Sequence, residues 1–354
     1  MNLLLSAVLL GVYVSAAQAW GVLGHATVAY VAQNFVKSTT ATWAKGVLGD
    51  TSTSYLANIA SWADTFRATT AGSFSAPFHF IDALDSPPTS CNVNFSRDCT
   101  KAGCSISGRH TSASVSASIT KVLAAIQNYT QRVQDGRLSA TNVNQALMFL
   151  VHFLGDITQP LHDENLDVGG NTINVVFQGF NDNLHADWDT FIPEQIAGGS
   201  SLNVAKAWAA NITTAITSGM YASQAASWIA GDDITDAVGS ATKWASDANT
   251  FVCSVVMPNG VAALQKGDLF PTYYNSVAPT VQLQLAKGGY RLANWLDQIA
   301  DSNLGLTRRN ELSEPRQAAE EGSISERDLL LDLSELSAAS VVRAAFGYDC
   351  GHAH

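Results

Sequence analysis

The sequence has little positive charge. Its 354 residues include 19 Lys and Arg against 30 Asp and Glu, which gives a formal net charge of −11 at pH 7. A negatively charged surface repels polyanions, so the general surface charge cannot bind nucleic acid. Any chemistry on phosphate groups would require a locally positive site, for example one made by metal ions.

Long apolar runs are absent after residue 19, so no later segment resembles a membrane span or anchor. Residues 1–19 carry no charged side chain and end with Ala17 and Ala19 in an A-x-A pattern. This pattern predicts a secretory signal peptide cleaved after Ala19, the alternative being an uncleaved anchor. The mature, secreted chain would begin at Trp20, whose free amine and carbonyl are then two potential metal ligands.

Cysteine is scarce, and the residues present are Cys91, Cys99, Cys104, Cys253 and Cys350. An odd number in an oxidising compartment leaves at least one thiol unpaired or bridged to another molecule. Cys99 and Cys104 could close a small loop, Cys91 with Cys253 would form a long-range disulfide, and Cys350 would remain. Three glycosylation sequons also fit secretion, at Asn94, Asn128 and Asn211.

Proline is rare as well, and residues 20–300 show mostly helical periodicity. Residues 25–36, HATVAYVAQNFV, place apolar side chains at i, i+3, i+4 and i+7. The stretch TINVVF, residues 172–177, is a short β candidate, and residues 82–109 are expected to form a disulfide-bearing loop.

Two segments differ from this helical body. Residues 108–124, GRHTSASVSASITKVLA, are rich in Ser, Ala and Thr and interrupt it. Residues 301–354 are rich in charge and poor in aromatics, which predicts a poorly ordered tail or a loosely attached helix.

Five of the eight histidines lie in the body outside these segments: His25, His79, His152, His162 and His185. The motifs HFLGD and HADWD place Asp156 and Asp189 four residues after His152 and His185. On a helix, side chains at this spacing share a face about 5–6 Å apart, which suits two ligands of one metal ion.

The remaining candidates lie near these pairs or in short motifs. His162 follows Pro160 and can fold back to the end of the helix that carries Asp156, while SWAD offers Asp64 and FHF offers His79. A single histidine on an apolar face is more often a core residue. Repeated pairs of His and carboxylate without free cysteine instead predict a multinuclear site for zinc or a similar divalent ion.

The N-terminus of the mature chain offers one more site. The Trp20 amine and carbonyl lie one helical turn before His25 and could complete a further metal site with it. The alternative is that Trp20 only packs in the core.

Together these motifs resemble the fungal S1/P1 nuclease family over about residues 20–300. The similar stretches are WGVLGHATVAYVAQ, SWADTFR, PFHFIDA, VHFLGDITQPLHDE, GGNTINV, NLHADWDT, DLFPTYY and AKGGYRLANWL. The resemblance implies an all-α single domain of the phospholipase C/P1 nuclease type, with a short β-hairpin and disulfide-bearing loops. Residues 108–124 depart from the family pattern, as a surface insertion or an error of the gene model, and the tail is not covered.

The resemblance also implies three zinc ions and assigns their ligands. Asp156 would bridge two of the ions. The first ion would be held by Asp64, His79, His152 and Asp156, the second by His162, His185 and Asp189, and the third by Trp20, His25 and Asp156.

The activity implied is hydrolysis of single-stranded DNA and RNA to 5′-phosphate products, together with cleavage of 3′-nucleotides. Arg67 would stabilise the oxyanion, and Asp64 and Asp156 would be the catalytic carboxylates that hold the ions. Phe80 would stack on a base, which favours unpaired strands, and Asp82 would hydrogen-bond the base edge. The alternatives for Arg67 and Phe80 are a surface ion pair and a core position.

Rival functions remain at this point. A zinc-dependent phospholipase C would share the metal scaffold, and an inactive secreted metal-binding protein would share the ligands. A third possibility is that residues 108–124 prevent folding. Without heptads or an obvious self-pairing edge, we expect a monomer.

Overall fold

The computed structural model of the chain describes residues 20–99 and 121–312. Helices dominate this part of the chain, and the strands form one antiparallel hairpin. The main elements are α1 (Val22–Phe35), α2 (Ser38–Leu48), α3 (Trp62–Arg67), η2 (Ser73–His79), α4 (Phe95–Asp98), α6 (Val122–Arg132), α7 (Ala140–Asp156), η3 (Pro160–Asp163), β1 (Asn174–Phe177), β2 (Phe180–Asn183), α8 (Leu184–Ala186), η4 (Asp187–Phe191), α9 (Ile192–Ala197), α10 (Leu202–Thr217), α11 (Ala225–Trp228), α12 (Ala237–Phe251), η6 (Val252–Val256), α13 (Val261–Leu264) and α14 (Thr272–Leu312).

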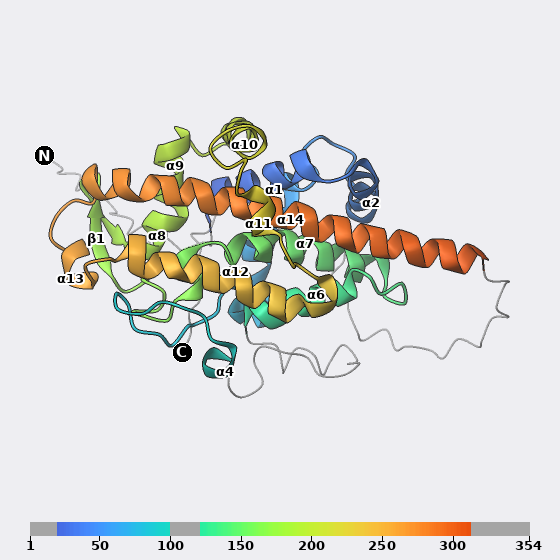
Figure 1. Cartoon of the computed structure of the whole chain (residues 1–354), viewed down its shortest axis with the longest axis horizontal. Coiled ribbons are helices and arrows are strands. Elements are labelled where there is room, and N and C mark those ends of the chain that lie inside the picture. Colours follow the sequence, from blue (N-terminus) through green and yellow to red (C-terminus); the bar gives the residue numbers. More distant parts are fainter. Residues whose placement is uncertain (1–19, 100–120, 313–354) are drawn as a thin grey trace, which may run out of the picture.

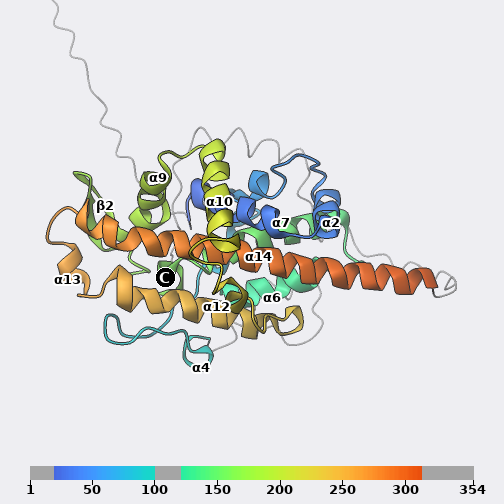
Figure 2. The same cartoon turned by 45° about the horizontal axis from the view of Figure 1, so that its top comes forward.

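Helix α14 runs along the whole helical body and organises it (Figure 1). Helices α1 and α7 pack against it, and α12 lies beside it in both views (Figure 2). Aromatic side chains of α12 and α14 pack against each other. Trp244 and Trp295 form an edge-to-face pair whose ring centroids lie 5.0 Å apart. The all-α fold class predicted from the sequence is therefore confirmed.

The β candidate is also confirmed. Strand β1 pairs with β2 from Asn174 opposite Asn183 to Phe177 opposite Phe180. The hairpin lies at one end of the molecule beside α13 (Figure 1). It leads directly into α8, so the HADWD motif follows the second strand.

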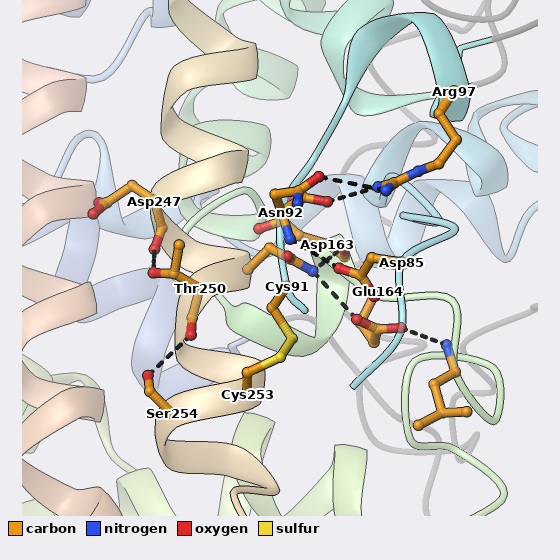
Figure 3. Close-up of a disulfide and its surroundings, with 12 residues drawn as sticks. Asp85, Cys91, Asn92, Arg97, Asp163, Glu164, Asp247, Thr250, Cys253 and Ser254 are labelled. Carbon is orange, nitrogen blue, oxygen red and sulfur yellow. Dashed lines mark hydrogen bonds between the residues drawn. A yellow bond between two sulfur atoms is a disulfide. The ribbon is translucent and has the colours of Figure 1, made fainter. Parts of the chain in front are cut away.

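The long-range disulfide is present. Cys91 is bonded to Cys253 across a sequence separation of 162 residues, which ties the loop after η2 to η6, the segment that directly follows α12 (Figure 3). Cys99 is also disulfide-bonded. Its predicted partner Cys104 and the leftover Cys350 lie outside the described residues.

The unusual segment and the tail are described in part. Within 108–124 the description begins at Lys121, and Val122, Leu123 and Ala124 form the buried start of α6. Their apolar side chains belong to the hydrophobic core. Helix α14 continues past residue 300 as far as Leu312, and the predicted signal peptide and the rest of the tail lie outside the described residues.

The sequons differ in exposure. Asn94 and Asn211 are exposed, whereas Asn128 is buried in α6 with 7% of its surface accessible. An N-glycan must sit on the surface, so this fold opposes glycosylation at Asn128. In the described part of the chain, no helix combines the length and hydropathy that a membrane span requires.

Candidate metal centre

Helix α7 delivers the first pair of donors. Its N-terminus is capped by Ser139, whose hydroxyl accepts a hydrogen bond from the Asn142 N–H, and its second half is fully buried. His152 and Asp156 lie one turn apart on this buried half, with His152 Nε2 3.3 Å from Asp156 Oδ2. The spacing predicted this pair, and it is confirmed.

The chain reverses just after Asp156. Gln159 accepts a hydrogen bond from the Leu161 N–H through its side chain, and Pro160 opens the 3₁₀ turn η3. Proline suits such a first position because its φ is fixed and no N–H is needed there. The turn brings His162 back to the same region, as the sequence predicted.

The second motif forms a comparable pair. His185 lies in α8 and Asp189 in the π-helical segment η4, and His185 Nε2 is 3.1 Å from Asp189 Oδ2. His162 completes the group, because its Nε2 lies 3.2 Å from His185 Nε2. The π-helical turn was not predicted.

Three elements that precede α7 in the sequence, α1, α3 and η2, supply the remaining donors. His25 of α1 places its Nε2 3.2 Å from Asp156 Oδ1. His79, at the end of η2, places its Nδ1 3.0 Å from Asp156 Oδ2 and 3.7 Å from Asp64 Oδ1 of α3. Asp156 therefore contacts histidines on two sides, which is the position expected for a bridging ligand.

These donors form three groups that could each hold a metal ion, and all their members are buried. The groups are His25 with His152 and Asp156, Asp64 with His79 and His152, and His162 with His185 and Asp189. A fourth group contains Cys91, whose sulfur is already in the disulfide, so it is not a comparable site.

The hydrogen-bonding pattern fits metal ions. The Nδ1 atoms of His152, His162 and His185 face the carbonyl oxygens of Ala60, His79 and Gly169 at 2.6–2.8 Å. When Nδ1 donates its proton to a carbonyl, the Nε2 lone pair is left for a metal ion.

The carboxylates point to the same conclusion. Asp64 is buried beside the Arg67 guanidinium, which offsets part of its charge. Both oxygens of Asp156 are buried with no hydrogen-bond partner among the described residues, although histidine nitrogens lie nearby. Burying an uncompensated carboxylate is costly, and a divalent cation between these oxygens and nitrogens would remove that cost. Without cysteine donors, such a site favours zinc or a similar ion.

The buried charges of the site shift the pKa values of one another. Burial works against it, yet the Asp156 and Asp64 carboxylates raise the pKa of His152 to about 10. Burial together with the Arg67 charge lowers the pKa of His79 to about 3. Despite burial, His152 and Arg67 hold the pKa of Asp64 well below its ordinary value. Protons and metal ions therefore compete for the same donors.

The other predicted site residues adjoin this centre. Arg67 is 8% exposed, and its Nη2 lies 3.1 Å from Asp64 Oδ1. Phe80 directly follows His79, and both Phe80 and Asp82 are partly exposed. Trp20 is fully buried; its indole N–H donates to Thr158 Oγ1 at 3.1 Å, and its carbonyl accepts from the His25 N–H.

Sequence reasoning missed two supporting residues. The Gln159 amide donates to Asp189 Oδ1 at 2.7 Å and so orients this carboxylate. The Thr158 hydroxyl accepts a hydrogen bond from the Trp20 indole N–H and donates one to the Gly155 carbonyl. Both lie in the TQP stretch between predicted ligands, and that proximity was the only signal in the sequence.

Gly155 permits the close approach of α1 and α7. A Cβ atom at this position would lie 2.8 Å from Nδ1 of His25, which is inside van der Waals contact. The rings of His25 and His152 are stacked here with centroids 3.9 Å apart. The glycine between His152 and Asp156 is thus required by the packing of the centre.

Fold and site together define a class of protein: a single helical body that buries a multinuclear His/Asp centre suited to divalent metal ions. Comparison of the sequence with known families gives a match to S1/P1 Nuclease over residues 20–301. The chain therefore belongs to the S1/P1 nuclease family, as the motifs predicted.

Individual relatives agree with this assignment. The chain is 57% identical to Nuclease P1 of Penicillium citrinum over 285 residues, which cover 80% of this chain and 99% of the relative. It is 51% identical over 281 residues to Nuclease S1 of Aspergillus oryzae, covering 79% and 92%. Endonuclease 3 of Arabidopsis thaliana is 29% identical over 301 residues, covering 83% and 94%.

The substitution Gly155→Ala tests the packing of the centre. The added methyl group should displace His25, lower the metal content per chain and reduce the free energy of unfolding by about 1–3 kcal/mol. Metal analysis and denaturant unfolding measure both effects.

Gly46→Ala is the matched control. Gly46 lies in α2 and a Cβ there would meet no atom within 4 Å. It should keep its metal and gain about 0.5–1 kcal/mol from helix propensity. Equal metal content in the two variants would contradict the role given to Gly155.

Proposed function

We propose that this protein is a secreted zinc-dependent nuclease that hydrolyses single-stranded DNA and RNA to 5′-phosphate products and also acts on 3′-nucleotides. The observation that carries the proposal is the set of three buried His/Asp groups, together with the two buried Asp156 oxygens that have no hydrogen-bond partner among the described residues. Relatives that share most of the chain are named nucleases.

The proposed ligand sets are those that the family resemblance implies. Asp64, His79, His152 and Asp156 would hold one zinc ion, and His162, His185 and Asp189 a second. Trp20, His25 and Asp156 would hold a third, with Asp156 shared between two ions. When bound, such closely spaced zinc ions supply an activated water molecule near neutral pH and attract the phosphate.

Arg67 is placed to bind the phosphate itself. Its guanidinium lies against Asp64 at the edge of the metal groups and is almost fully buried. A desolvated guanidinium binds phosphate oxygens in a fixed geometry and stabilises the charge that develops on them. We assign it the oxyanion-stabilising role.

Phe80 and Asp82 would bind the base. Phe80 adjoins His79, so a base stacked on its ring would be next to a phosphate at the metal centre. Stacking needs an unpaired base and accepts any base type, which explains a preference for single strands.

Secretion is part of the proposal because the third site needs a free N-terminal amine. The family match begins at Trp20, the residue predicted to follow the cleavage site. The disulfide between Cys91 and Cys253 fits an oxidising compartment. We expect glycans only at Asn94 and Asn211, and a monomeric enzyme.

A substrate panel tests the proposal. The purified mature protein should hydrolyse single-stranded DNA, RNA and a 3′-mononucleotide, and it should leave phosphatidylcholine intact. Exhaustive chelation should abolish all three activities and added zinc should restore them. Turnover of the lipid alone would identify a phospholipase C instead, and a protein that holds zinc without hydrolysing any substrate would be an inactive metal-binding protein.

Arg67→Ala tests the role of the guanidinium. Loss of this donor should lower kcat by about 10²–10³-fold while the zinc content stays unchanged. Arg137→Ala is the control, because Arg137 pairs with Asp135 at the exposed surface. A variant of Arg67 with normal kcat would show that the residue forms only a structural ion pair with Asp64.

A further inference from the structure

Lys121 lies at the proposed base site. Its Nζ pairs with Asp82 Oδ2 and lies over the ring of Phe80, 5.4 Å from the centroid. It thus contacts both side chains that would bind the base.

The backbone fixes Lys121 in this place. Lys121 is the residue before α6, and the next residue, Val122, donates its N–H to the Phe80 carbonyl at 3.1 Å. Val122 and Leu123 are fully buried and anchor the start of the helix. Lys121 is therefore held beside Phe80 by main-chain geometry as well as by its charge.

The contact remains accessible to a ligand. The side chains of Lys121 and Asp82 are 20% and 14% exposed, so the ion pair is partly open to solvent. A base that stacks on Phe80 would meet an ammonium and a carboxylate together.

The two charged groups differ in what they can bind. A carboxylate only accepts hydrogen bonds, whereas an ammonium only donates them. Asp82 alone would accept from the N–H groups of a base and repel its carbonyl oxygens. Uracil and thymine present one N–H between two carbonyl oxygens, so a lone carboxylate suits them least. Lys121 supplies the donor that such a carbonyl needs.

We infer that Lys121 determines base specificity by letting the site accept bases whose N–H is flanked by carbonyl oxygens, uracil and thymine above all. The inference rests on the proposed nuclease function. Lys121 belongs to the segment 108–124 that departs from the family pattern, so sequence reasoning assigned it no role.

Hydrolysis of the dinucleotides UpU and ApA by Lys121→Met tests the inference. The ratio of kcat/KM for UpU to that for ApA should fall about threefold to tenfold, the size of one lost hydrogen bond. Lys121→Arg keeps the donor and should keep the ratio close to that of the unaltered protein. Lys206→Met removes an exposed lysine of α10 and should leave the ratio unchanged.

Asp82→Asn provides a second, independent measurement. If Lys121 acts together with Asp82, Lys121→Met should change the ratio much less in an Asp82→Asn background. An unchanged or higher ratio in Lys121→Met, with ApA still hydrolysed, would overturn the inference and leave the nuclease function intact. Failure of the unaltered protein to hydrolyse either dinucleotide would overturn both.

Discussion

The burial of Asp156 among histidine nitrogens is the constraint on which the structure depends. This carboxylate is inaccessible to water and contacts His25, His79 and His152. A folded core cannot keep such a group without a compensating charge. Protonated His152 can supply that charge, and the metal ions proposed for the three groups would supply it in place of the proton. Bound ions would also give an acidic protein a local positive charge that attracts phosphate.

The fold supplies this environment through a few structural features. Helix α7 carries two donors on its buried half, the turn at Pro160 returns a third, and the hairpin leads into the helical turn that carries Asp189. Gly155 allows α1 close enough for His25 to contribute. The long helix α14 and the Cys91–Cys253 disulfide hold these elements together.

The sequence predicted the features that depend on residues close together in the chain. The His–Asp pairs of α7 and of the HADWD motif follow from helical spacing, and the fold class follows from periodicity and family motifs. The π-helical turn, the orienting bond from Gln159 and the contact of Lys121 with Asp82 could not be predicted. Each depends on which distant segments meet, and a single sequence does not encode those distances in any short-range pattern.

X-ray diffraction from crystals of the purified protein, recorded on both sides of the zinc absorption edge, tests the central claim most directly. The account predicts three zinc peaks per chain, one in each His/Asp group, with the Trp20 amine as a ligand of the ion beside His25. Fewer peaks, or a chain that begins at another residue and still binds three ions, would contradict it.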